Sequence, residues 1–418
     1  MRDVTLIDQP NSSGRQTRRF QEKREAILDA AARSINRYGV RGTTLTDVGA
    51  SVGLMTNSVT YYYRKKEDLA VACYLRAFET LEHVLGVAER QTTAEGRVRA
   101  FQTGYFRLLA EIASGERSEF VSFNDITALT GSAAEVVAPG YINLFRRVRG
   151  LITAGGASSL SRIQANARTQ FLLAVTLWAR VWVNRYEVDG YARAADHASD
   201  IMLRGFGAPH ARWAPQPLDV SGLPEADNDE VSPEAFLRAA TRLINEQGFH
   251  GASVEKISAS LNVTKGSFYH HNDNKDDLIV DCFARSFAVI RRTQAAAAGC
   301  ENGWQQLCSA AAALVRFQVS NQGPLLRITA RSGLPEAAAD ETLRTMNRQS
   351  ERFANFVVDG IADGSVRPVD PAIVAQLVNG MINAAASITR WVPGADIGNA
   401  ADLFARPLFM GLLSGDGK

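Results

Sequence analysis

Residues 44–69 read TLTDVGASVGLMTNSVTYYYRKKEDL, and residues 253–278 read SVEKISASLNVTKGSFYHHNDNKDDL. The two stretches align without a gap at a constant offset of 209 residues, which indicates two copies of one structural unit. In each copy, apolar residues recur at helical spacing and are followed by Gly53 or Asn262, which both tolerate the left-handed backbone of a sharp turn. The pattern predicts a helix, a turn and a second short helix.

The second helix of each copy has one apolar residue that is expected to face the core, and this residue is Val59 in the first copy and Phe268 in the second. The remaining residues are short polar groups, a lysine and aromatic rings, which suit insertion into the major groove of double-stranded DNA. Thr44 and Ser253 precede the first helix, where a hydroxyl can cap the helix and the helix start can bind a phosphate. The candidate DNA contacts are Thr44, Thr56, Asn57, Ser58, Thr60, Tyr61, Tyr62, Lys66, Ser253, Lys265, Gly266, Ser267, Tyr269, His270, His271 and Lys275.

These residues resemble a known family. Residues 263–278, VTKGSFYHHNDNKDDL, are similar to the signature of the TetR/AcrR transcriptional regulators, and residues 54–69 of the first copy end in the same way. The segments GVRGTT at 39–44 and GFHGAS at 248–253 resemble the family's approach to the second helix. The resemblance implies an all-α fold of two tandem TetR-like units. Each unit would contain an N-terminal three-helix DNA-binding domain and a C-terminal helical bundle that binds a ligand and dimerises.

The repeat and the local composition define the expected domain boundaries. Arginines without helical periodicity near the start indicate a basic arm that is expected to be disordered, and the first helix is expected from about Lys23 to Gly39. A stretch rich in proline and acidic residues indicates a linker between the units. The expected segments are the arm at 1–22, DNA-binding domains at 23–70 and 232–279, regulatory and dimerisation domains at 71–213 and 280–418, and the linker at 214–231.

Composition excludes several other classes of protein. The chain has 418 residues and a formal net charge of +2, so it can hold two units with separate cores and is not a polycation. No apolar run reaches the roughly 18 residues that span a bilayer, and the start lacks a signal-peptide core, so a cytoplasmic protein without membrane contact is expected.

Metal chemistry and catalysis are also not expected. The four cysteines lack zinc spacing, and the adjacent His270 and His271 would point about 100° apart on a helix, so no metal is predicted. The sequence has no phosphate-binding loop, serine-hydrolase elbow or zinc-protease motif. We therefore expect neither an enzyme nor a cofactor.

The resemblance also implies a mechanism. Members of the family usually act as symmetric dimers whose recognition helices lie about one turn of DNA, or a multiple of it, apart. This chain is therefore expected to be an intramolecular pseudo-dimer and a repressor that a small-molecule inducer releases from DNA. The two recognition helices differ at almost every outward position, which predicts an asymmetric operator. Residues 23–69 contain eight basic and five acidic residues, and residues 232–278 contain five and six, so the first copy should bind DNA more strongly.

Two further expectations follow from the family pattern. The family's C-terminal helices enclose an apolar pocket for the inducer, although aromatic residues at helical spacing also form cores. Both copies depart from the pattern, at Thr60 in the first and Asn272 in the second, so the alternative is an interaction protein in which one or both helix-turn-helix units no longer bind DNA. Further self-association of the chain is left open. The candidate pocket residues are Phe101, Tyr105, Phe123, Phe171 and Trp178.

Overall fold

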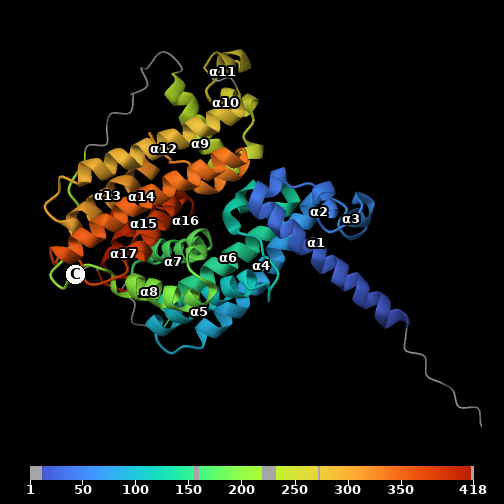
Figure 1. The fold of residues 1–418 in the computed structure, drawn as a ribbon, viewed down its shortest axis with the longest axis horizontal. Coiled ribbons are helices and arrows are strands. Elements are labelled where there is room, and N and C mark those ends of the chain that lie inside the picture. The colour runs from blue at the N-terminus through green and yellow to red at the C-terminus, as the bar shows by residue number, and fades with distance from the viewer. Residues whose placement is uncertain (1–11, 155–159, 219–231, 272–273, 416–418) are drawn as a thin grey trace, which may run out of the picture.

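The computed structural model describes residues 12–154, 160–218, 232–271 and 274–415. Its described part is helical, with one isolated β-bridge between Gly207 and Val366 in place of strands. Figure 1 shows two three-helix heads, α1–α3 and α9–α11, carried by a common body of longer helices. The all-α fold with two tandem units that the sequence predicts is therefore confirmed.

The first unit begins with the helix-turn-helix head and continues into a bundle. Helix α4 leaves the head and packs against α5 and α6, while α5 packs against α8. Its elements are α1 (Ser12–Gly42), α2 (Leu45–Ser51), α3 (Thr56–Tyr62), α4 (Lys66–Glu89), α5 (Ala94–Ala113), η1 (Phe123–Ala128), α6 (Gly131–Thr153), α7 (Arg162–Trp182), η2 (Val183–Arg185), η3 (Val188–Gly190) and α8 (Tyr191–Arg204).

The second unit repeats this order. Helix α12 leaves the second head and packs against α13 and α14, and α14 packs against α15. Its elements are α9 (Pro233–Gln247), η4 (Phe249–Gly251), α10 (Val254–Ser260), α11 (Lys265–His271), α12 (Lys275–Ala297), α13 (Gly303–Val319), η5 (Ile328–Gly333), α14 (Glu336–Ala362), α15 (Pro371–Ala385), α16 (Ile388–Trp391), η6 (Ala401–Ala405) and α17 (Arg406–Met410).

The first helix is longer than the sequence pattern indicates. It begins at Ser12, so the predicted arm is wrong for residues 12–22, whereas residues 1–11 lie outside the described part. The reason is local, because residues 15–24 contain neither glycine nor proline and are mainly arginine, glutamine, glutamate and lysine, which favour a helix even without a buried side. The backbone breaks at Gly39, as predicted, with φ of 73°.

The C-terminal helices of the two units pack against each other. Helix α7 contacts α15 and η6, and α8 contacts α15 and α17. The approach of α7 and α15 is close, since a Cβ atom built at Gly380 would lie 2.6 Å from Cδ1 of Trp178. Where α8 and α17 end, Phe206 N donates to the carbonyl of Phe409 at 3.2 Å and Leu412 N donates to that of Met202 at 2.7 Å. The two bonds cross the interface in opposite directions, which gives it an approximate twofold character.

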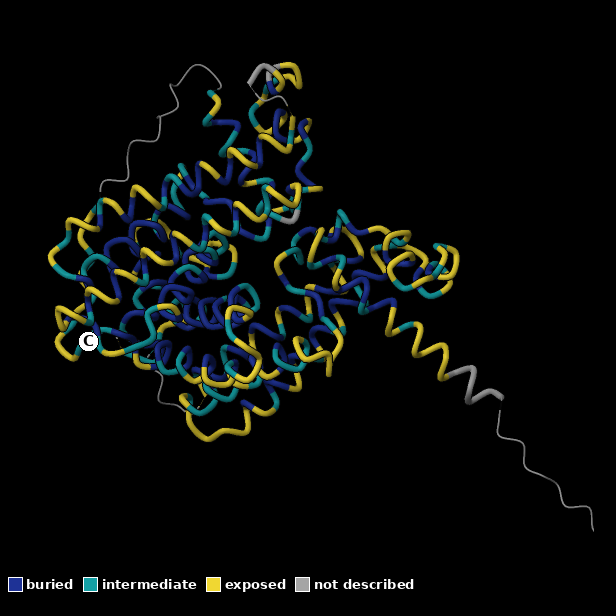
Figure 2. Tube along the Cα trace, viewed as in Figure 1, coloured by how far each residue is buried: buried dark blue, intermediate teal, exposed yellow. Residues whose placement is uncertain are grey.

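Buried residues run through the inner sides of the bundle helices in both units (Figure 2). Cys73 and Cys282, which are equivalent in the repeat, are both fully buried, and each thiol faces a backbone carbonyl of the first helix of its own head. Burial raises the pKa of each thiol to about 12, so neither forms a reactive thiolate near neutral pH. In the described part of the chain, no helix combines the length and hydropathy required to cross a membrane.

The chain after α8 lies along the second unit before it reaches the undescribed residues 219–231. Trp213 Nε1 donates to Asp402 at 2.7 Å, and Gln216 N donates to the hydroxyl of Ser309 at 3.0 Å. Residues 214–218, predicted as the start of the linker, have no regular secondary structure and contact the second unit.

Candidate nucleic-acid interface and inter-unit cavity

The first head has the helix-turn-helix geometry that its sequence predicts. The hydroxyl of Thr44 accepts a hydrogen bond from Asp47 N at 3.1 Å and so caps α2. Gly53 adopts φ of 68° in the turn, and Val59 is fully buried beneath α3. Met55 occupies the N-cap position of α3 without a side-chain capping bond, and Thr56 is the first residue of this helix.

The second head repeats these features. Ser253 caps α10 by accepting from Lys256 N at 3.3 Å, and Asn262 adopts φ of 57° in the turn. Phe268 is fully buried beneath α11, as Val59 is beneath α3. Each recognition helix therefore has one fully buried side chain that faces the core of its head, Val59 on α3 and Phe268 on α11.

The candidate contacts of the first head are largely accessible. Asn57 and Ser58 are exposed, and Tyr61 is 76% exposed. Thr56 and Thr60 are half-buried, with their hydroxyls donating to Thr46 Oγ1 and to the carbonyl of Asn57 respectively.

An aromatic contact that the sequence did not predict lies beside this surface. Phe20, on the N-terminal extension of α1, packs on Tyr62 with ring centroids 4.7 Å apart and on Tyr61 at 6.2 Å. The ring of Tyr62 is half-buried as a result. Because the arm was expected to be disordered, no pattern in the sequence could indicate this contact.

The second head presents a different set of side chains. Lys265 is exposed and forms an ion pair with Glu255 at 2.5 Å, and this pair lowers the pKa of Glu255 to about 2. Gly266 is exposed and Tyr269 is 50% exposed. The predicted contacts at Ser267, His270 and His271 fall on side chains outside the described residues.

Two lysines predicted to bind phosphates have partners inside the protein. Lys66 Nζ donates to the carbonyl of Arg41 at 3.0 Å, and Lys275 Nζ donates to the carbonyl of Phe249 and lies 4.0 Å from the centre of its ring. Both lysines are half-buried, and burial lowers the pKa of Lys275. Each therefore joins the start of the fourth helix of its unit to the segment just before the second helix, and the phosphate role stays a prediction.

The two heads meet around Asp125 of η1. Its Oδ2 accepts from Val40 N at 3.1 Å, and a Cβ atom built at Gly39 or at Gly248 would lie 2.2 Å or 3.4 Å from this carboxylate. Burial raises the pKa of Asp125. Nearby, the hydroxyl of Thr127 donates to the carbonyl of Glu246 in the second head at 2.9 Å.

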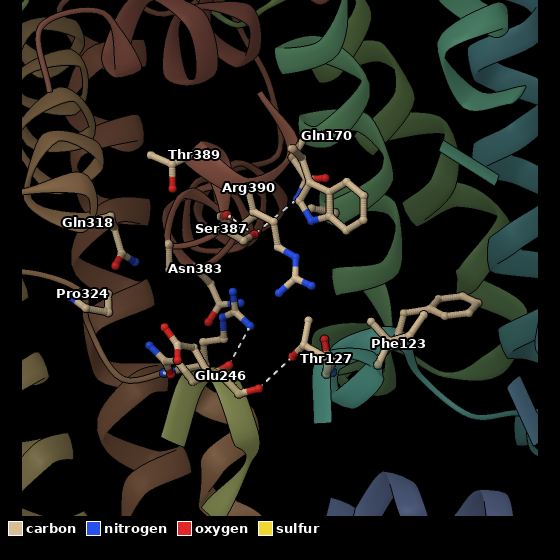
Figure 3. Close-up of a pocket in the computed structure, with 18 of the residues that line it drawn as sticks. Phe123, Thr127, Gln170, Glu246, Gln318, Pro324, Asn383, Ser387, Thr389 and Arg390 are labelled. Carbon is tan, nitrogen blue, oxygen red and sulfur yellow. Dashed lines mark hydrogen bonds between the residues drawn. The ribbon is translucent and has the colours of Figure 1, made fainter. Parts of the chain in front are cut away.

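A cavity of about 960 Å³ lies between the two units, behind the contact between the heads (Figure 3). Its wall includes residues of α1, η1, α6 and α7 of the first unit and of α9, α10, α13, α15 and α16 of the second. The lining residues include Arg41, Phe123, Tyr141, Gln170, Leu177, Trp178, Arg242, Glu246, Lys256, Arg327, Gly380, Arg390 and Trp391.

The five predicted pocket residues divide between this cavity and the core. Phe123 and Trp178 line the cavity. Phe101, Tyr105 and Phe171 are at most 1% exposed and are not among its lining residues. For these three the sequence pattern is explained by core packing, and a ligand contact stays a prediction.

Comparisons with known proteins agree with the geometry of the heads. The family of bacterial regulatory proteins named tetR matches residues 27–73 and again residues 236–282, and a tetracyclin repressor-like C-terminal domain matches residues 300–392. The two N-terminal matches contain both helix-turn-helix segments.

Among curated proteins, the chain is 24% identical over 157 residues to the transposon Tn10 TetC protein of Escherichia coli, covering 37% of this chain and 79% of TetC. It is 28% identical over 157 residues to the uncharacterized HTH-type transcriptional regulator YdeS of Bacillus subtilis, covering 37% of this chain and 77% of YdeS. Both relatives thus align with less than half of this chain, which agrees with a tandem arrangement.

Among solved structures, AibR in complex with isovaleryl coenzyme A and operator DNA is 20% identical and covers 44% of this chain and 99% of its own, with a TM-score of 0.37. FadR from Bacillus subtilis in complex with stearoyl-CoA is 18% identical and covers 43% and 99%, with a TM-score of 0.32. On its two N-terminal domain matches and its C-terminal match, this chain belongs to the TetR family of DNA-binding transcriptional regulators, which are not enzymes, and it carries the family's N-terminal domain twice.

Proposed function

We propose that one chain acts as a pseudo-dimer that binds a single operator with both heads and is released from it by a small molecule. The observation that carries the proposal is the packing of α7 and α8 against α15, η6 and α17 within one chain. This packing joins two helix-turn-helix heads by the kind of helical interface that a symmetric dimer forms between chains. The location expected for such a regulator is the cytoplasm.

The operator should consist of two unlike half-sites. Tyr61 and Asn57 are exposed on α3, whereas the exposed residues of α11 include Lys265 and Tyr269. Base recognition depends on the hydrogen-bonding groups that reach the major groove, so these two helices favour different sequences. A protein that occupies a promoter most simply blocks transcription from it, so we expect this regulator to be a repressor.

Release by a small molecule requires a site that is coupled to both heads. The inter-unit cavity meets this requirement, because its wall includes Arg41 from the end of α1 and Arg242 from α9. A ligand that binds better to the released conformation than to the DNA-bound one shifts the equilibrium towards release. A tenfold loss of DNA affinity needs only about 1.4 kcal/mol of differential binding.

A second candidate is a regulator in which only the first head reads DNA. The ion pair between Lys265 and Glu255 favours it, because the one lysine of α11 is already paired with a carboxylate. The second head also has fewer basic than acidic residues. In this case the second head would bind another partner, or would only hold the first head in position.

Footprinting on the DNA that flanks the protein's own gene, combined with the mass of the complex in solution, tests the proposal. One chain per site and two protected segments of unlike sequence are expected. Protection of one segment only would favour the second candidate. A perfect palindrome protected by two chains would reject the internal pseudo-dimer in favour of self-association between chains, and no specific site at all would leave a non-DNA-binding interaction protein.

A further inference from the structure

We propose that the cavity between the two units binds a small amphipathic anion, which is a carboxylate or phosphate ester with an apolar body. The proposal goes beyond the regulatory function in naming both the place and the chemistry of the ligand. It rests on that function only for its consequence, which is release from DNA. The binding itself depends on the cavity and is tested without DNA.

The charge of the cavity wall favours an anion. Five cationic side chains face one carboxylate, that of Glu246, and this carboxylate belongs to the end of α9. A cavity lined by one sign of charge attracts the opposite sign, and its low-dielectric wall strengthens the attraction. The cations are Arg41, Arg242, Lys256, Arg327 and Arg390.

Two of these cations differ from the others in their hydrogen bonding. Arg390 extends into the open space between the units (Figure 3), and its guanidinium carbon lies 5.9 Å from the centre of the Trp391 ring. Arg41 has a buried Nε that lacks a hydrogen-bond partner there. By contrast, Arg242 donates to two backbone carbonyls, those of Asn321 and Gly323.

The wall also contains buried polar atoms without a hydrogen-bond partner in the described structure. Gln170 Oε1 and Trp178 Nε1 have no hydrogen bond in the described structure, although Gln170 is only 5% exposed and Trp178 only 7%. Leaving a buried donor or acceptor unpaired costs about 1–3 kcal/mol. A ligand or water in the cavity removes that cost, so these atoms mark where a polar group of the ligand is expected.

Apolar side chains supply the rest of the wall. Trp391 packs against Tyr141 with ring centroids 4.7 Å apart, and Phe123 lies on the other side of Tyr141 at 5.7 Å. Leu177 continues this apolar surface along α7. With a volume of about 960 Å³, the cavity falls in the range of small-molecule sites, which are mostly apolar with a few placed polar groups.

The cavity differs from a pocket enclosed within one bundle. Its wall is contributed by both units, with Trp178 from α7 opposite Arg390 from α16. An anion held between them fixes the spacing of the units, and through Arg41 it also contacts the first head. One ligand per chain is therefore expected, rather than one per unit.

Three probes with the same apolar body and different heads test the proposal: octanoate, octyl phosphate and octanol. Trp178 and Trp391 are two of the five tryptophans and line the cavity, so intrinsic fluorescence of the full chain reports occupancy. Calorimetry gives the stoichiometry. We expect one saturable site for each anionic probe and binding of octanol that is weaker by about tenfold, which equals about 1.4 kcal/mol.

Substitutions at Arg390 distinguish a charge-selective site from an apolar crevice. The side chain is exposed, and its described contact is the ring of Trp391, whose centroid lies 5.9 Å from the guanidinium carbon. Arg390→Gln should therefore preserve thermal stability, weaken octanoate about tenfold and leave octanol unchanged. Arg390→Lys should retain most of the affinity. Arg352→Gln, an exposed arginine on α14 that does not line the cavity, is the matched control and should bind as the parent does.

Several outcomes would overturn the proposal. These are equal affinities for all three probes, two equivalent sites per chain, unchanged anion binding in Arg390→Gln, or no saturable binding of either anion up to millimolar concentration. DNA is absent from these measurements, so a failure here leaves operator binding untouched. Conversely, a chain that binds octanoate but no operator would support the site and reject the regulatory function.

Discussion

Arg41 and His250 occupy equivalent positions in the two repeats, and each covers a glycine of the other head. A Cβ atom built at Gly251 would lie 2.8 Å from Cδ of Arg41, and one built at Gly42 would lie 2.5 Å from Cδ2 of His250. Gly42 and Gly251 are themselves equivalent in the repeat. The contact between the heads is therefore reciprocal, and a Cβ atom at either glycine would force Arg41 or His250 to shift.

This contact makes stability depend on pH near neutrality. Burial, followed by the charge of Lys275, lowers the pKa of His250 below its usual value. The unfolded chain then binds the proton more readily, so the free energy of unfolding falls as pH decreases through about 6.5 and below. Thermal melts between pH 8 and pH 5 should show a smaller loss in His250→Gln than in the parent.

The exposed His83 on α4 provides a control for this prediction. It lies outside the contact between the heads, so His83→Gln should follow the parent curve. Parallel curves for the parent and His250→Gln would contradict the assignment. Because the His250 ring is exposed, the difference in pH dependence between His250→Gln and the parent should be small. The measurement tests the direction of this difference.

The two recognition helices should contribute to different half-sites. Tyr61→Ala and Tyr269→Ala are each expected to weaken operator binding by about 1–3 kcal/mol and to remove protection from one half of the footprint only. Tyr61→Phe removes only the hydroxyl, so it distinguishes the contribution of the hydroxyl to operator binding from that of the ring. Ile397 is an exposed apolar residue of the second bundle, and Ile397→Ala should change neither the operator affinity nor the footprint. Loss of both halves in one tyrosine variant would show that the heads do not bind independently.

Lys66 is expected to have both a structural and an electrostatic effect. Lys66→Ala removes the hydrogen bond to the carbonyl of Arg41, so the free energy of unfolding should fall by about 1–3 kcal/mol. If the lysine also neutralises a phosphate, the slope of log affinity against log salt should decrease by about one. Lys65→Ala, at the exposed neighbouring position, should leave stability unchanged. Unaltered DNA binding of Lys66→Ala at every salt concentration would exclude the phosphate role.

The crossing of α8 and α17 should tolerate no side chain at Gly205. This residue has φ of 68°, and a Cβ atom would lie 2.1 Å from the carbonyl oxygen of Phe409. Gly364 has φ of 80° with open space around it. Urea unfolding should give a cost of about 1 kcal/mol for Gly364→Ala, from backbone strain alone, and about 1–3 kcal/mol more for Gly205→Ala. Equal costs would mean that the crossing relaxes freely.

Helix α4 should transmit ligand binding to the first head. Phe78 on α4 stacks on Phe123 of the cavity wall, with ring centroids 5.2 Å apart and planes at 13°. Phe78→Leu should therefore change the ligand concentration needed for DNA release more than it changes DNA affinity without ligand. Phe283→Leu on α12 tests the second unit in the same way. Strictly proportional losses of both properties, with unchanged thermal stability, would show that these helices do not couple the sites.

Local features of the heads were predictable because they depend on residues close in sequence. The turn residues Gly53 and Asn262, the caps Thr44 and Ser253 and the buried Val59 follow from spacing and backbone preference alone. The internal repeat gave the number of units for the same reason. The N-terminal extension of α1 was not predictable in this way, because residues 12–22 lack the apolar spacing that marks a buried helix side.

The cavity was not predictable, because its wall joins residues from opposite ends of the chain. Arg41 and Arg390 belong to different units, and no periodicity relates them. Apolar spacing also cannot separate a core residue such as Phe171 from a wall residue such as Trp178, since both face inward on α7. The relative placement of the two units decides whether Phe171 or Trp178 lines the cavity.

The hydrogen bonds that Phe206 and Leu412 make across the interface affect how promoter occupancy depends on the number of protein copies in the cell. Partners held on one polypeptide face each other at an effective concentration that is typically millimolar, however dilute the solution. A regulator assembled from separate chains dissociates when few copies are present, and its response then rises with the square of copy number. This chain cannot lose its second half on dilution, so promoter occupancy should rise with the first power of copy number, even at a few molecules per cell.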